Sequence, residues 1–193
     1  RTATLQKACD HIALSHAKIF STTGLATRRP PAELSSEASA DLLRKANELR
    51  SMTLFRHFSD ELIIPLAKIV VEESVGPGGV VFGEGDASRD LKIVRDGRVR
   101  IARTTPVGTQ VLTTLGQGAL FGEVSYLDRL PRSATAFAVG QSSLYSLPGD
   151  ALDDAVATDR ELAVSLLWGF WQTLAAKVRA ANAQMNELFG APA

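Results

Sequence analysis

The uneven distribution of glycine constrains the fold of this 193-residue chain more than any other feature. Twelve of the 15 glycines lie between Gly76 and Gly149, where they separate short runs of β-branched and aliphatic residues. Regular turns between short apolar runs are typical of a β-sandwich, jelly roll or barrel. On both sides of this region, apolar residues recur with the period of a helix. The sequence therefore predicts an α+β chain in which helices flank a central β-structure.

The central region, about residues 71–147, is expected to consist of short strands joined by turns. The strand-like runs are 79–82, 91–94, 99–103, 111–115, 134–139 and 143–147, and a further short strand ends at Phe121. The turn signals are 83–86, Asp96-Gly97, 106–108 and 116–118. An Asp-Gly pair between two strand-like runs is a strong hairpin signal. We therefore expect the runs 91–94 and 99–103 to form a hairpin.

Residues 1–70 have helical patterns. Leu5, Ile12 and Ile19 form a weak apolar stripe, and Pro30-Pro31 ends any helix before it. A second helix is predicted over 37–50. A third follows Ser59, a plausible N-cap. Its predicted buried face consists of Leu62, Ile63, Leu66, Ile69 and Val70.

Residues 148–189 are predicted to form a short helix, 150–157, and a long one, 159–189. About thirty residues at about 1.5 Å each make the long helix about 45 Å. Its apolar residues follow a 4-3-4-3 spacing that is typical of a coiled-coil seam; they are Leu167, Trp171, Leu174, Val178, Ala181, Met185 and Leu188. This seam either joins a parallel homodimer, which we favour, or packs on the chain's own barrel. Trp168 and Trp171 are expected in the core and the seam.

Composition narrows the partners and the location. Lys plus Arg (21) balances Asp plus Glu (21), so the net charge provides no general attraction to nucleic acid or anionic membranes. The single Cys9 excludes an intramolecular disulfide and fits a reducing, cytoplasmic location. The longest uncharged stretch, 162–176, is too short to span a bilayer, and no secretory signal is evident.

One segment has the pattern of an anion-binding site. A strand ends at Phe121, Gly122 permits a close backbone turn, and a short helix is expected to begin near Glu123. Nine residues later, Arg132 begins the next strand; its guanidinium is able to bind two phosphate oxygens at once. A carboxylate such as Glu123 repels phosphate but accepts hydrogen bonds from hydroxyls. A carboxylate and a guanidinium in one pocket thus point to a ligand with a phosphate and a sugar.

These residues resemble the phosphate-binding cassette of the cyclic-nucleotide-binding domains, found in catabolite activator proteins, kinase regulatory subunits and nucleotide-gated channels. Residues 54–59 resemble the family's entry helix, 79–86 the turn after its second strand, and 91–99 its central hairpin. The resemblance covers about residues 52–189. It implies a double-stranded β-helix, a jelly-roll-like β-roll, with N-terminal helices and a long C-terminal helix. We divide the chain into a helical segment, 1–51, and a binding domain, 52–189, with its roll at 71–147 and its C-terminal helices at 148–189.

The resemblance also implies residue roles. Arg132 binds the cyclic phosphate, and Glu123 accepts a hydrogen bond from the ribose 2′-hydroxyl. Gly122 and Ser133 add backbone donors, and the Ser133 hydroxyl is a further phosphate donor. The remaining ligand-binding residues of the cassette are Val124 and Ala134.

The long helix is expected to cover the nucleotide base. Segment 175–182 resembles the base-contacting helix of the catabolite activator family, which places Ala181 and Asn182 at the contacting positions. Asn182 has the donors and acceptor to read a purine edge, and Arg179 is a candidate for stacking on the base. Solvated helix residues are the alternative for both. Tyr126 departs from the small or aliphatic residues usual in the cassette; we expect it to pack away from the pocket, the alternative being that it narrows the pocket.

Two other classes fit less well. A metal-dependent enzyme of the cupin type needs histidines on its barrel strands, but His11, His16 and His57 all precede the predicted barrel. A DNA-binding regulator of the catabolite activator type has a helix-turn-helix domain after the long helix, whereas four residues follow Phe189 here. We therefore expect no metal site, no catalytic residues and no DNA binding by this chain.

The sequence thus predicts a cytoplasmic, non-enzymatic sensor whose ligand is a cyclic mononucleotide, cAMP rather than cGMP, with no separate cofactor. Ligand binding is expected to change the arrangement of the helices and of a homodimer held by the C-terminal helix. A downstream protein partner is possible. The alternative is a regulatory fragment of a larger channel, transporter or signalling enzyme.

Overall fold

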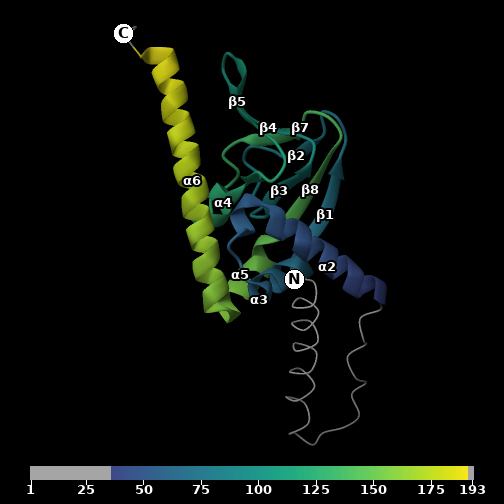
Figure 1. Ribbon diagram of the computed structural model, residues 1–193. Coiled ribbons are helices and arrows are strands. Elements are labelled where there is room, and N and C mark those ends of the chain that lie inside the picture. Colours follow the sequence, from purple (N-terminus) through teal and green to yellow (C-terminus); the bar gives the residue numbers. More distant parts are fainter. Residues whose placement is uncertain (1–35, 191–193) are drawn as a thin grey trace, which may run out of the picture.

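The computed structural model describes residues 36–190 (Figure 1). Its helices are α2 (Ser36–Ser51), the 3₁₀ helix η1 (Thr53–Phe55), α3 (Asp60–Ile69), α4 (Glu123–Asp128), α5 (Gly149–Thr158) and α6 (Arg160–Phe189). Its strands are β1 (Val71–Val75), β2 (Val80–Phe82), β3 (Leu91–Asp96), β4 (Val99–Thr105), β5 (Gly108–Leu115), β6 (Leu120–Phe121), β7 (Thr135–Ala138) and β8 (Ser142–Leu147). The stripe predicted at Leu5, Ile12 and Ile19 and the break at Pro30-Pro31 lie outside the described residues.

The strands form two antiparallel four-stranded sheets. Their strand orders are β1-β8-β3-β6 and β2-β7-β4-β5. Apolar side chains from both sheets make one buried cluster between them, consisting of Phe82, Val94, Val99, Phe121, Ala136 and Leu144. Two sheets that enclose a common core between flanking helices form the jelly-roll-like β-roll that the sequence predicts.

The predicted hairpin at Asp96-Gly97 is wrong. Strand β3 pairs with β6 and β8, whereas β4 pairs with β5 and β7, so the two strands belong to different sheets. Gly97 has a φ of 86°, and a Cβ there would lie 2.5 Å from the Ser142 hydroxyl oxygen. Asp-Gly therefore forms a tight corner at which the chain leaves one sheet for the other. The true hairpin joins β4 to β5 through Pro106-Val107.

A second core lies between the first sheet and the helices. Strand β3 sends Leu91 and Ile93 to the helical side and Val94 to the inter-sheet side, so the strand is buried on both faces. Its helical partners are Leu49 of α2, Phe55 of η1, Leu62, Ile63 and Leu66 of α3, Leu152 of α5, and Leu162, Leu166 and Phe170 of α6. Since α2 contributes to this core, it packs as part of the same body as the roll; the division at 51/52 stays a prediction.

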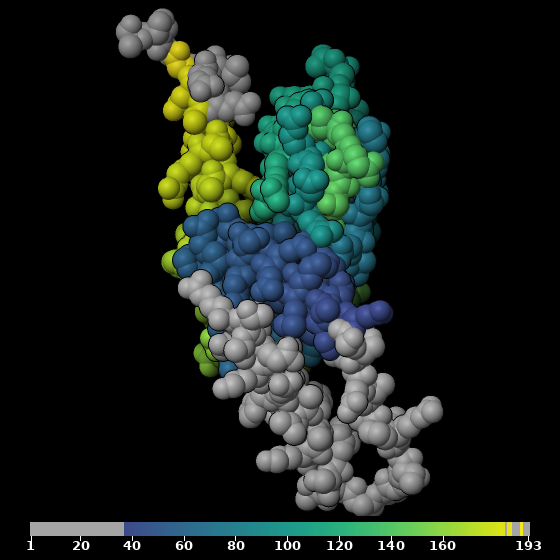
Figure 2. Space-filling view, turned by 45° about the vertical axis from the view of Figure 1, so that its right-hand side comes forward, coloured from purple at the N-terminus to yellow at the C-terminus, as the bar shows by residue number. Residues whose placement is uncertain are grey.

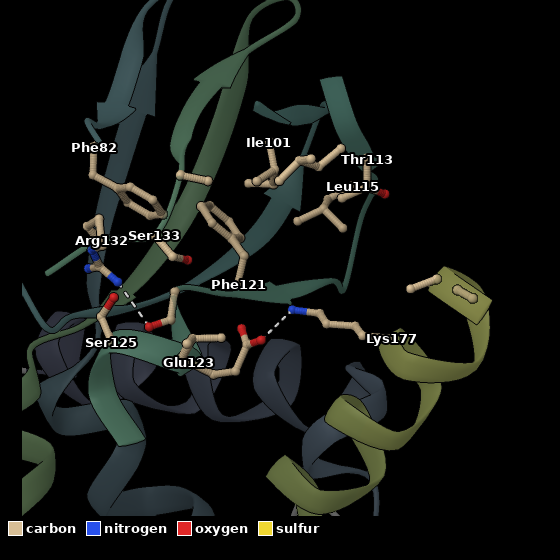
Figure 3. A pocket seen from close by; sticks show the side chains of 16 residues that line it. Phe82, Ile101, Thr113, Leu115, Phe121, Glu123, Ser125, Arg132, Ser133 and Lys177 are labelled. Atoms are coloured by element: carbon tan, nitrogen blue, oxygen red, sulfur yellow. Dashed lines mark hydrogen bonds and ion pairs between the residues drawn. The ribbon is translucent and has the colours of Figure 1, made fainter. Parts of the chain in front are cut away.

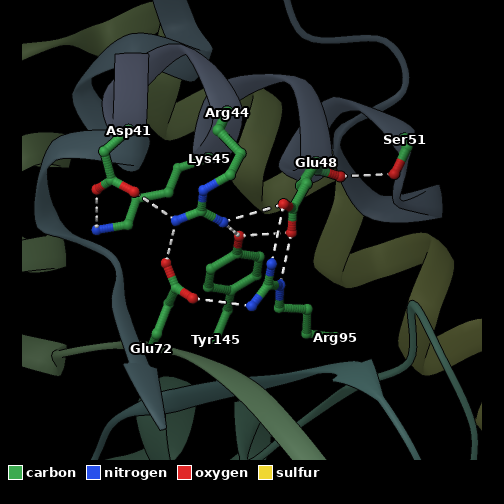
Figure 4. Close-up of polar contacts among 8 residues, drawn as sticks. All are labelled: Asp41, Arg44, Lys45, Glu48, Ser51, Glu72, Arg95 and Tyr145. Atoms are coloured by element: carbon green, nitrogen blue, oxygen red, sulfur yellow. Dashed lines mark hydrogen bonds and ion pairs between the residues drawn. The ribbon is translucent and has the colours of Figure 1, made fainter. Parts of the chain in front are cut away.

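A cluster of charged side chains fastens α2 to the roll (Figure 4). Glu48 accepts hydrogen bonds from Arg95 at 2.6 Å and from the Tyr145 hydroxyl at 2.7 Å. Arg44 pairs with Glu48 at 3.0 Å and also with Glu72, which Arg95 reaches at 2.8 Å. These five residues are called the α2 cluster below. Within it, each cation has at least two carboxylate partners.

Helix α6 is set by its own cap and by one buried face. The Asp159 carboxylate accepts from the Leu162 backbone N–H, as an N-cap does. Leu162, Leu166 and Phe170 pack into the helical core. The helix begins beside α5 and runs alongside the roll as far as the level of the β5 hairpin (Figure 1). No helix within residues 36–190 combines the length and the hydropathy that crossing a membrane requires.

The predicted seam lies on a different face of α6 from the core residues. Leu167, Trp171, Val178 and Met185 are exposed, and Trp171 is 68% exposed. The side chain of Leu188 lies outside the described set. Leu174 is half-buried, however, and Ala181 faces the roll, so the seam is only partly exposed in the single chain. Trp168 is exposed as well, so its predicted core position is wrong: Phe170 occupies the buried face, and Trp168 lies two residues, about 200°, away around the helix.

Candidate functional site

A cavity of about 320 Å³ lies between the roll and α6, where Figure 2 shows the surface hollowed beside the long helix. Figure 3 shows its lining side chains. The lining side chains come from the roll and from two helices. The roll contributes Phe82, Ile101, Leu112, Thr113, Leu115, Phe121, Gly122, Arg132, Ser133 and Ala134. Helix α4 contributes Glu123, Val124 and Ser125, and α6 contributes Lys177, Ala180 and Ala181. This size is within the range of small-molecule sites.

The turn after β2 fixes the backbone of Arg132. The Arg132 N–H donates to the Asp86 carbonyl oxygen, and the Arg132 carbonyl oxygen accepts from the Gly85 N–H, both at 2.8 Å. The predicted turn at 83–86 and the predicted anion-binding arginine thus lie side by side, although 45 residues of chain separate Asp86 from Arg132.

The Arg132 guanidinium is buried among neutral groups. It donates to the Gly122 carbonyl oxygen at 2.9 Å, the Asp90 carbonyl oxygen at 2.7 Å and the Ser88 hydroxyl at 3.1 Å, and it stacks 4.1 Å from the centre of the Phe82 ring. Arg132 is 2% exposed, and among residues 36–190 no carboxylate lies within ion-pair distance of it. Burial therefore lowers the pKa of Arg132, against the opposing field of nearby carboxylates.

Gly122 fits this arrangement because it has no side chain. Its φ is 79°, a left-handed value that disfavours residues with a Cβ. A Cβ at this position would lie 2.5 Å from Nη1 of Arg132 and 3.0 Å from the Asp90 carbonyl oxygen. Gly122 therefore provides both the turn into α4 and the space that the guanidinium fills.

Glu123 is the buried anion of the cavity. Only 2% of the residue is exposed, and its Oε1 accepts from the Lys177 ammonium at 2.7 Å (Figure 3). Its Oε2 is buried and has no hydrogen-bond partner within residues 36–190. A buried carboxylate oxygen without a donor is costly unless a ligand supplies one.

Six of the eight site residues predicted from sequence lie together in this cavity. They are Gly122, Glu123, Val124, Arg132, Ser133 and Ala134. Arg179 and Asn182 do not line it in the single chain; both are exposed. The reason is helical periodicity: Lys177, Ala180 and Ala181 share one face of α6, and residues 179 and 182 project from the others at 100° per residue. Their base contact stays a prediction, and Asn182 borders seam residues one turn away on either side.

Tyr126 packs away from the cavity. Its ring lies 6.0 Å from that of Phe170, and its hydroxyl bonds with the Asp153 carboxylate of α5. Burial, followed by this hydrogen bond, raises the pKa of Tyr126. The tyrosine thus joins α4 to the C-terminal helices and does not narrow the pocket. This outward packing of Tyr126 is the one expected from sequence.

Prediction from sequence missed Lys177 and the apolar wall of the cavity. Lys177 stands four residues before Ala181, so a base-contacting helix face that includes Ala181 also includes Lys177. Phe82 and Phe121 each precede a turn glycine and belong to strands whose inward face was predictable. Ile101, Leu112 and Leu115 had no local feature that distinguished them from other strand residues.

A buried cation without a carboxylate partner, a buried acceptor without a donor and an apolar wall define an anion-binding site for a ligand that also carries a hydroxyl. Comparison with known proteins agrees with this class. The family model of the cyclic nucleotide-binding domain matches residues 72–159. The chain belongs to this family, whose members are regulatory nucleotide-binding domains rather than enzymes.

Individual relatives support the same conclusion. The "CRP-like cAMP-activated global transcriptional regulator" of Mycobacterium tuberculosis is 30% identical over 136 residues, which are 70% of this chain and 59% of the regulator. The chain therefore spans about six tenths of that relative's length. The crystal structure of a cyclic nucleotide-binding domain from Methylobacillus flagellatus KT has a TM-score of 0.69 at 25% identity, covering 80% of this chain and 88% of that one. The N-terminal domain of a transcriptional regulator from Streptomyces coelicolor A3(2) has a TM-score of 0.58 at 32% identity, covering 72% and 94%.

Proposed function

We propose that this domain is a sensor that binds a cyclic mononucleotide in the cavity between the roll and α6. Arg132 and Ser133 bind the cyclic phosphate, and Glu123 accepts a hydrogen bond from the ribose 2′-hydroxyl. Gly122 contributes a backbone donor, while Val124 and Ala134 complete the cassette. The observation that carries the proposal is that one cavity holds two buried groups that lack a partner of the opposite kind: the Arg132 guanidinium, which is hydrogen-bonded but has no carboxylate partner, and a Glu123 oxygen without a donor.

The charge of the cavity favours a monoanion. Its charged lining residues are Arg132, Lys177 and Glu123, so two cations and one anion leave one positive charge. A cyclic phosphate diester carries one negative charge, whereas a terminal phosphate carries about two near neutral pH. Charge balance therefore supports the cyclic ligand over the linear nucleotide.

Titration calorimetry of the unmodified chain with cAMP, cGMP and cyclic di-GMP tests the proposal. We expect saturable one-site binding of at least one mononucleotide and no comparable binding of cyclic di-GMP, whose second nucleotide exceeds the cavity. Chromatography of the same mixtures should return intact ligand, because the proposed function includes no hydrolysis. Absence of binding by both mononucleotides would contradict the proposal, and formation of linear AMP in proportion to protein would replace it with a phosphodiesterase.

We further propose that cAMP is preferred over cGMP. In this family, a threonine directly after the cassette arginine favours cGMP through its hydroxyl. Here Ser133 keeps the hydroxyl but lacks the methyl group that restricts its rotamer. The Mycobacterium tuberculosis relative is by its name cAMP-activated. One bidentate base contact, for which Asn182 is the candidate, corresponds to about 1–3 kcal/mol, or about 5- to 150-fold.

Competition of unlabelled cAMP and cGMP against a fluorescent cAMP analogue tests this preference. The expected result is a lower inhibitory concentration for cAMP. Equal potency or tighter cGMP binding would reject it. If the advantage of cAMP narrows in Asn182→Ala, the carboxamide reads the base; if it does not, selectivity resides around Ser133.

A homodimer through the exposed seam of α6 is also proposed. Leu167, Trp171, Val178 and Met185 present exposed apolar surface along one side of α6, the helix that lies at the edge of the molecule (Figure 1). Such a stripe favours a helical partner. Val178→Glu should convert dimers to monomers in light scattering, since it buries an unpaired charge in the seam. The matched control is Ala183→Glu, on the opposite side of the helix, which should leave the mass unchanged. An unmodified chain that stays monomeric at high concentration would contradict the dimer.

The proposed output is a change in helix arrangement. Ligand binding at Arg132 tightens the site, and the helices after Pro148 close over the base. A ligand shifts such an equilibrium only by its differential affinity for the closed arrangement. The change in helix arrangement acts on one of three targets: the dimer itself, a protein partner, or another part of a larger channel, transporter or signalling enzyme. A cytoplasmic location is part of this proposal.

A further inference from the structure

The two sheets of the roll differ in the partners of their cations. In the first sheet, β1-β8-β3-β6, Lys92 contacts Glu73 at 2.7 Å and Arg95 contacts Glu72 at 2.8 Å. Helices of the described residues pack on this sheet through the helical core. The strands of the second sheet, β2-β7-β4-β5, contain two arginines and no acidic residue. The second sheet therefore carries positive charge that its own strands do not balance.

One row of side chains crosses the outer face of the second sheet. Cross-strand pairing aligns Val80, Phe137, Arg100 and Thr114, one residue from each strand. The residues that precede Phe137 and Arg100 in the chain both belong to the buried cluster between the sheets. Successive side chains of a strand point to opposite faces, so Phe137 and Arg100 lie on the outer face. Val80 is 64% exposed and Thr114 is also exposed, so the row is accessible from outside.

Arg100 is held by an aromatic ring rather than by a carboxylate. Its guanidinium carbon lies 5.8 Å from the centre of the Phe137 ring, and its Nε is buried without a hydrogen-bond partner in residues 36–190. Arg103 of the same strand, by contrast, contacts Glu84 at 3.3 Å. Arg98 is exposed and, like Arg100, has no carboxylate within ion-pair distance in the described part of the chain. The row thus contains a guanidinium that lacks an acceptor, and a second unpaired cation lies two residues before it.

These features favour an acidic protein partner. Arginine and aromatic side chains are enriched in protein interfaces, where arginine binds carboxylates through two parallel hydrogen bonds. An arginine that is already stacked on a ring loses little side-chain freedom when it binds. A sheet face with exposed apolar side chains is the surface that helices cover within a domain, as they cover the first sheet here. The occupant that best matches the row is therefore a helix with carboxylates beside apolar side chains.

We propose that the outer face of the second sheet is a docking surface for an acidic amphipathic helix of a partner protein. A carboxylate of that helix accepts hydrogen bonds from the Arg100 guanidinium, and Arg98 adds a second positive charge. Apolar side chains of the helix pack on Val80 and Phe137. Ile101, next to Arg100, lines the nucleotide cavity, so the cavity and the docking surface lie on opposite faces of β4. The docking surface is thus independent of nucleotide binding.

A pair of designed peptides tests the charge and the surface together. The acidic peptide is an amphipathic helix with leucine and glutamate on one face, and its counterpart has glutamine in place of every glutamate. Titration calorimetry gives the affinity of each peptide for the unmodified chain, Arg100→Gln and the control Arg160→Gln. The control removes an exposed arginine from the start of α6, outside the second sheet. Thermal unfolding verifies that each variant is folded.

The acidic peptide should bind Arg100→Gln about fivefold or more weakly than the unmodified chain, as expected for a central interface residue, whereas Arg160→Gln should bind it like the unmodified chain. The glutamine peptide should bind the unmodified chain more weakly than the acidic peptide does. Amide NMR shifts caused by the acidic peptide should map to Val80, Phe137 and Thr114. The affinity of Arg100→Gln for cAMP should stay within about twofold of the unmodified chain, because the cavity lies on the other face of β4.

Any of four results would overturn the proposal. No detectable binding of the acidic peptide to the unmodified chain would mean that the face is not a docking surface for such a helix. Equal affinity of the unmodified chain for both peptides would mean that carboxylates are not recognised. Equal affinity of the unmodified chain and Arg100→Gln for the acidic peptide would remove Arg100 from the surface. Amide shifts confined to the cavity lining would place the peptide at Arg132 and Lys177 instead.

Discussion

The α2 cluster and the cavity beside α6 both contain an arginine and a glutamate, but these residues differ in how far the chain itself provides their charge and hydrogen-bond partners. In the α2 cluster, Arg95 contacts the carboxylates of Glu48 and Glu72, and its pKa is raised chiefly by the hydrogen bond with Glu48. In the cavity, Arg132 contacts two carbonyl oxygens, a hydroxyl and an aromatic ring, and burial lowers its pKa. Arg95 thus has carboxylate partners within the chain, whereas Arg132 is hydrogen-bonded only to uncharged groups.

The two carboxylates differ in the same way. Both oxygens of Glu48 accept hydrogen bonds, from Arg44, Arg95 and Tyr145. Glu123 is bound at one oxygen only, and the other is buried without a donor. Desolvated groups left unsatisfied by the fold are the ones that a ligand is able to satisfy. Charged residues are thus present in both regions. The binding site differs from the α2 cluster because its arginine has no carboxylate partner and its carboxylate has one oxygen without a donor.

The largest expected effect on cAMP affinity comes from replacing Arg132 of the cavity rather than Arg95 of the α2 cluster. Arg132→Ala should weaken cAMP binding by about 30-fold to several thousand-fold, since removing one side of a desolvated charge pair costs roughly 2–5 kcal/mol. Arg132→Lys should also bind poorly, because an ammonium lacks the two-pronged donor geometry. Fluorescence competition gives the affinities. Circular dichroism verifies that each variant is folded, because the substitution also removes the hydrogen bonds from Arg132 to the carbonyl oxygens of Gly122 and Asp90.

Arg95→Ala is the matched control, because it removes the same side chain from the α2 cluster. Its affinity for cAMP should stay within about twofold of the unmodified chain, while its thermal stability falls. If Arg132→Ala binds as well as the unmodified chain, the cassette assignment is wrong. If Arg95→Ala loses binding as severely as Arg132→Ala, the functional distinction between the two regions fails.

A smaller effect is expected from Gly122→Ala. The added methyl group imposes a positive φ on alanine and lies 2.5 Å from Nη1 of Arg132, which must move. A strained backbone position corresponds to about 1–3 kcal/mol, so cAMP affinity should fall about 5- to 150-fold. Gly140→Ala is the control, because a Cβ there meets nothing within 4 Å. Equal affinities for the two variants would show that the spacing between Gly122 and Arg132 is irrelevant to binding.

The smallest effect on binding is expected from Glu48→Gln, which acts on stability instead. The pKa of Glu48 is lowered from 4.5 to about 2, mainly by its hydrogen bond with Arg95. A lowered pKa stabilises the fold above pH 4.5, and this contribution is lost as the pH falls toward 2. Glu48→Gln should therefore reduce the free energy of unfolding by about 1–3 kcal/mol at neutral pH.

Denaturant unfolding of both proteins between pH 7 and pH 2 measures this difference. The gap between the unmodified chain and Glu48→Gln should shrink below pH 4.5, with cAMP affinity at neutral pH nearly unchanged. A gap that is constant with pH would show that the Glu48 charge contributes nothing to the α2 cluster.

Much of the fold and of the site was predictable because the decisive features are local. The helix predicted at 159–189 is α6, Arg160–Phe189, and the helix expected near Glu123 is α4. The six strand-like runs coincide with strands to within three residues at each end. Gly122, Glu123, Arg132 and Ser133 were identifiable because one short segment carries them, and the fold brings them into the same cavity.

The errors concern features that depend on which elements meet. Asp96-Gly97 specifies a tight corner, but whether β3 and β4 pair depends on the competing partners β8 and β7. Trp168 looked like a core residue by type, yet the face of α6 that is buried is decided by η1 and the surrounding helices, which contact Phe170 instead. Lys177 is paired with Glu123, which lies 54 residues earlier in the chain.

The crystal structure of the chain with cAMP tests the central claim most directly. The account predicts cyclic phosphate oxygens at about 2.7–2.9 Å from the Arg132 guanidinium, with the 2′-hydroxyl donating to Oε2 of Glu123. A nucleotide bound outside this cavity would contradict the account. So would a phosphate held by Lys177 while Arg132 contacts only the carbonyl oxygens of Gly122 and Asp90.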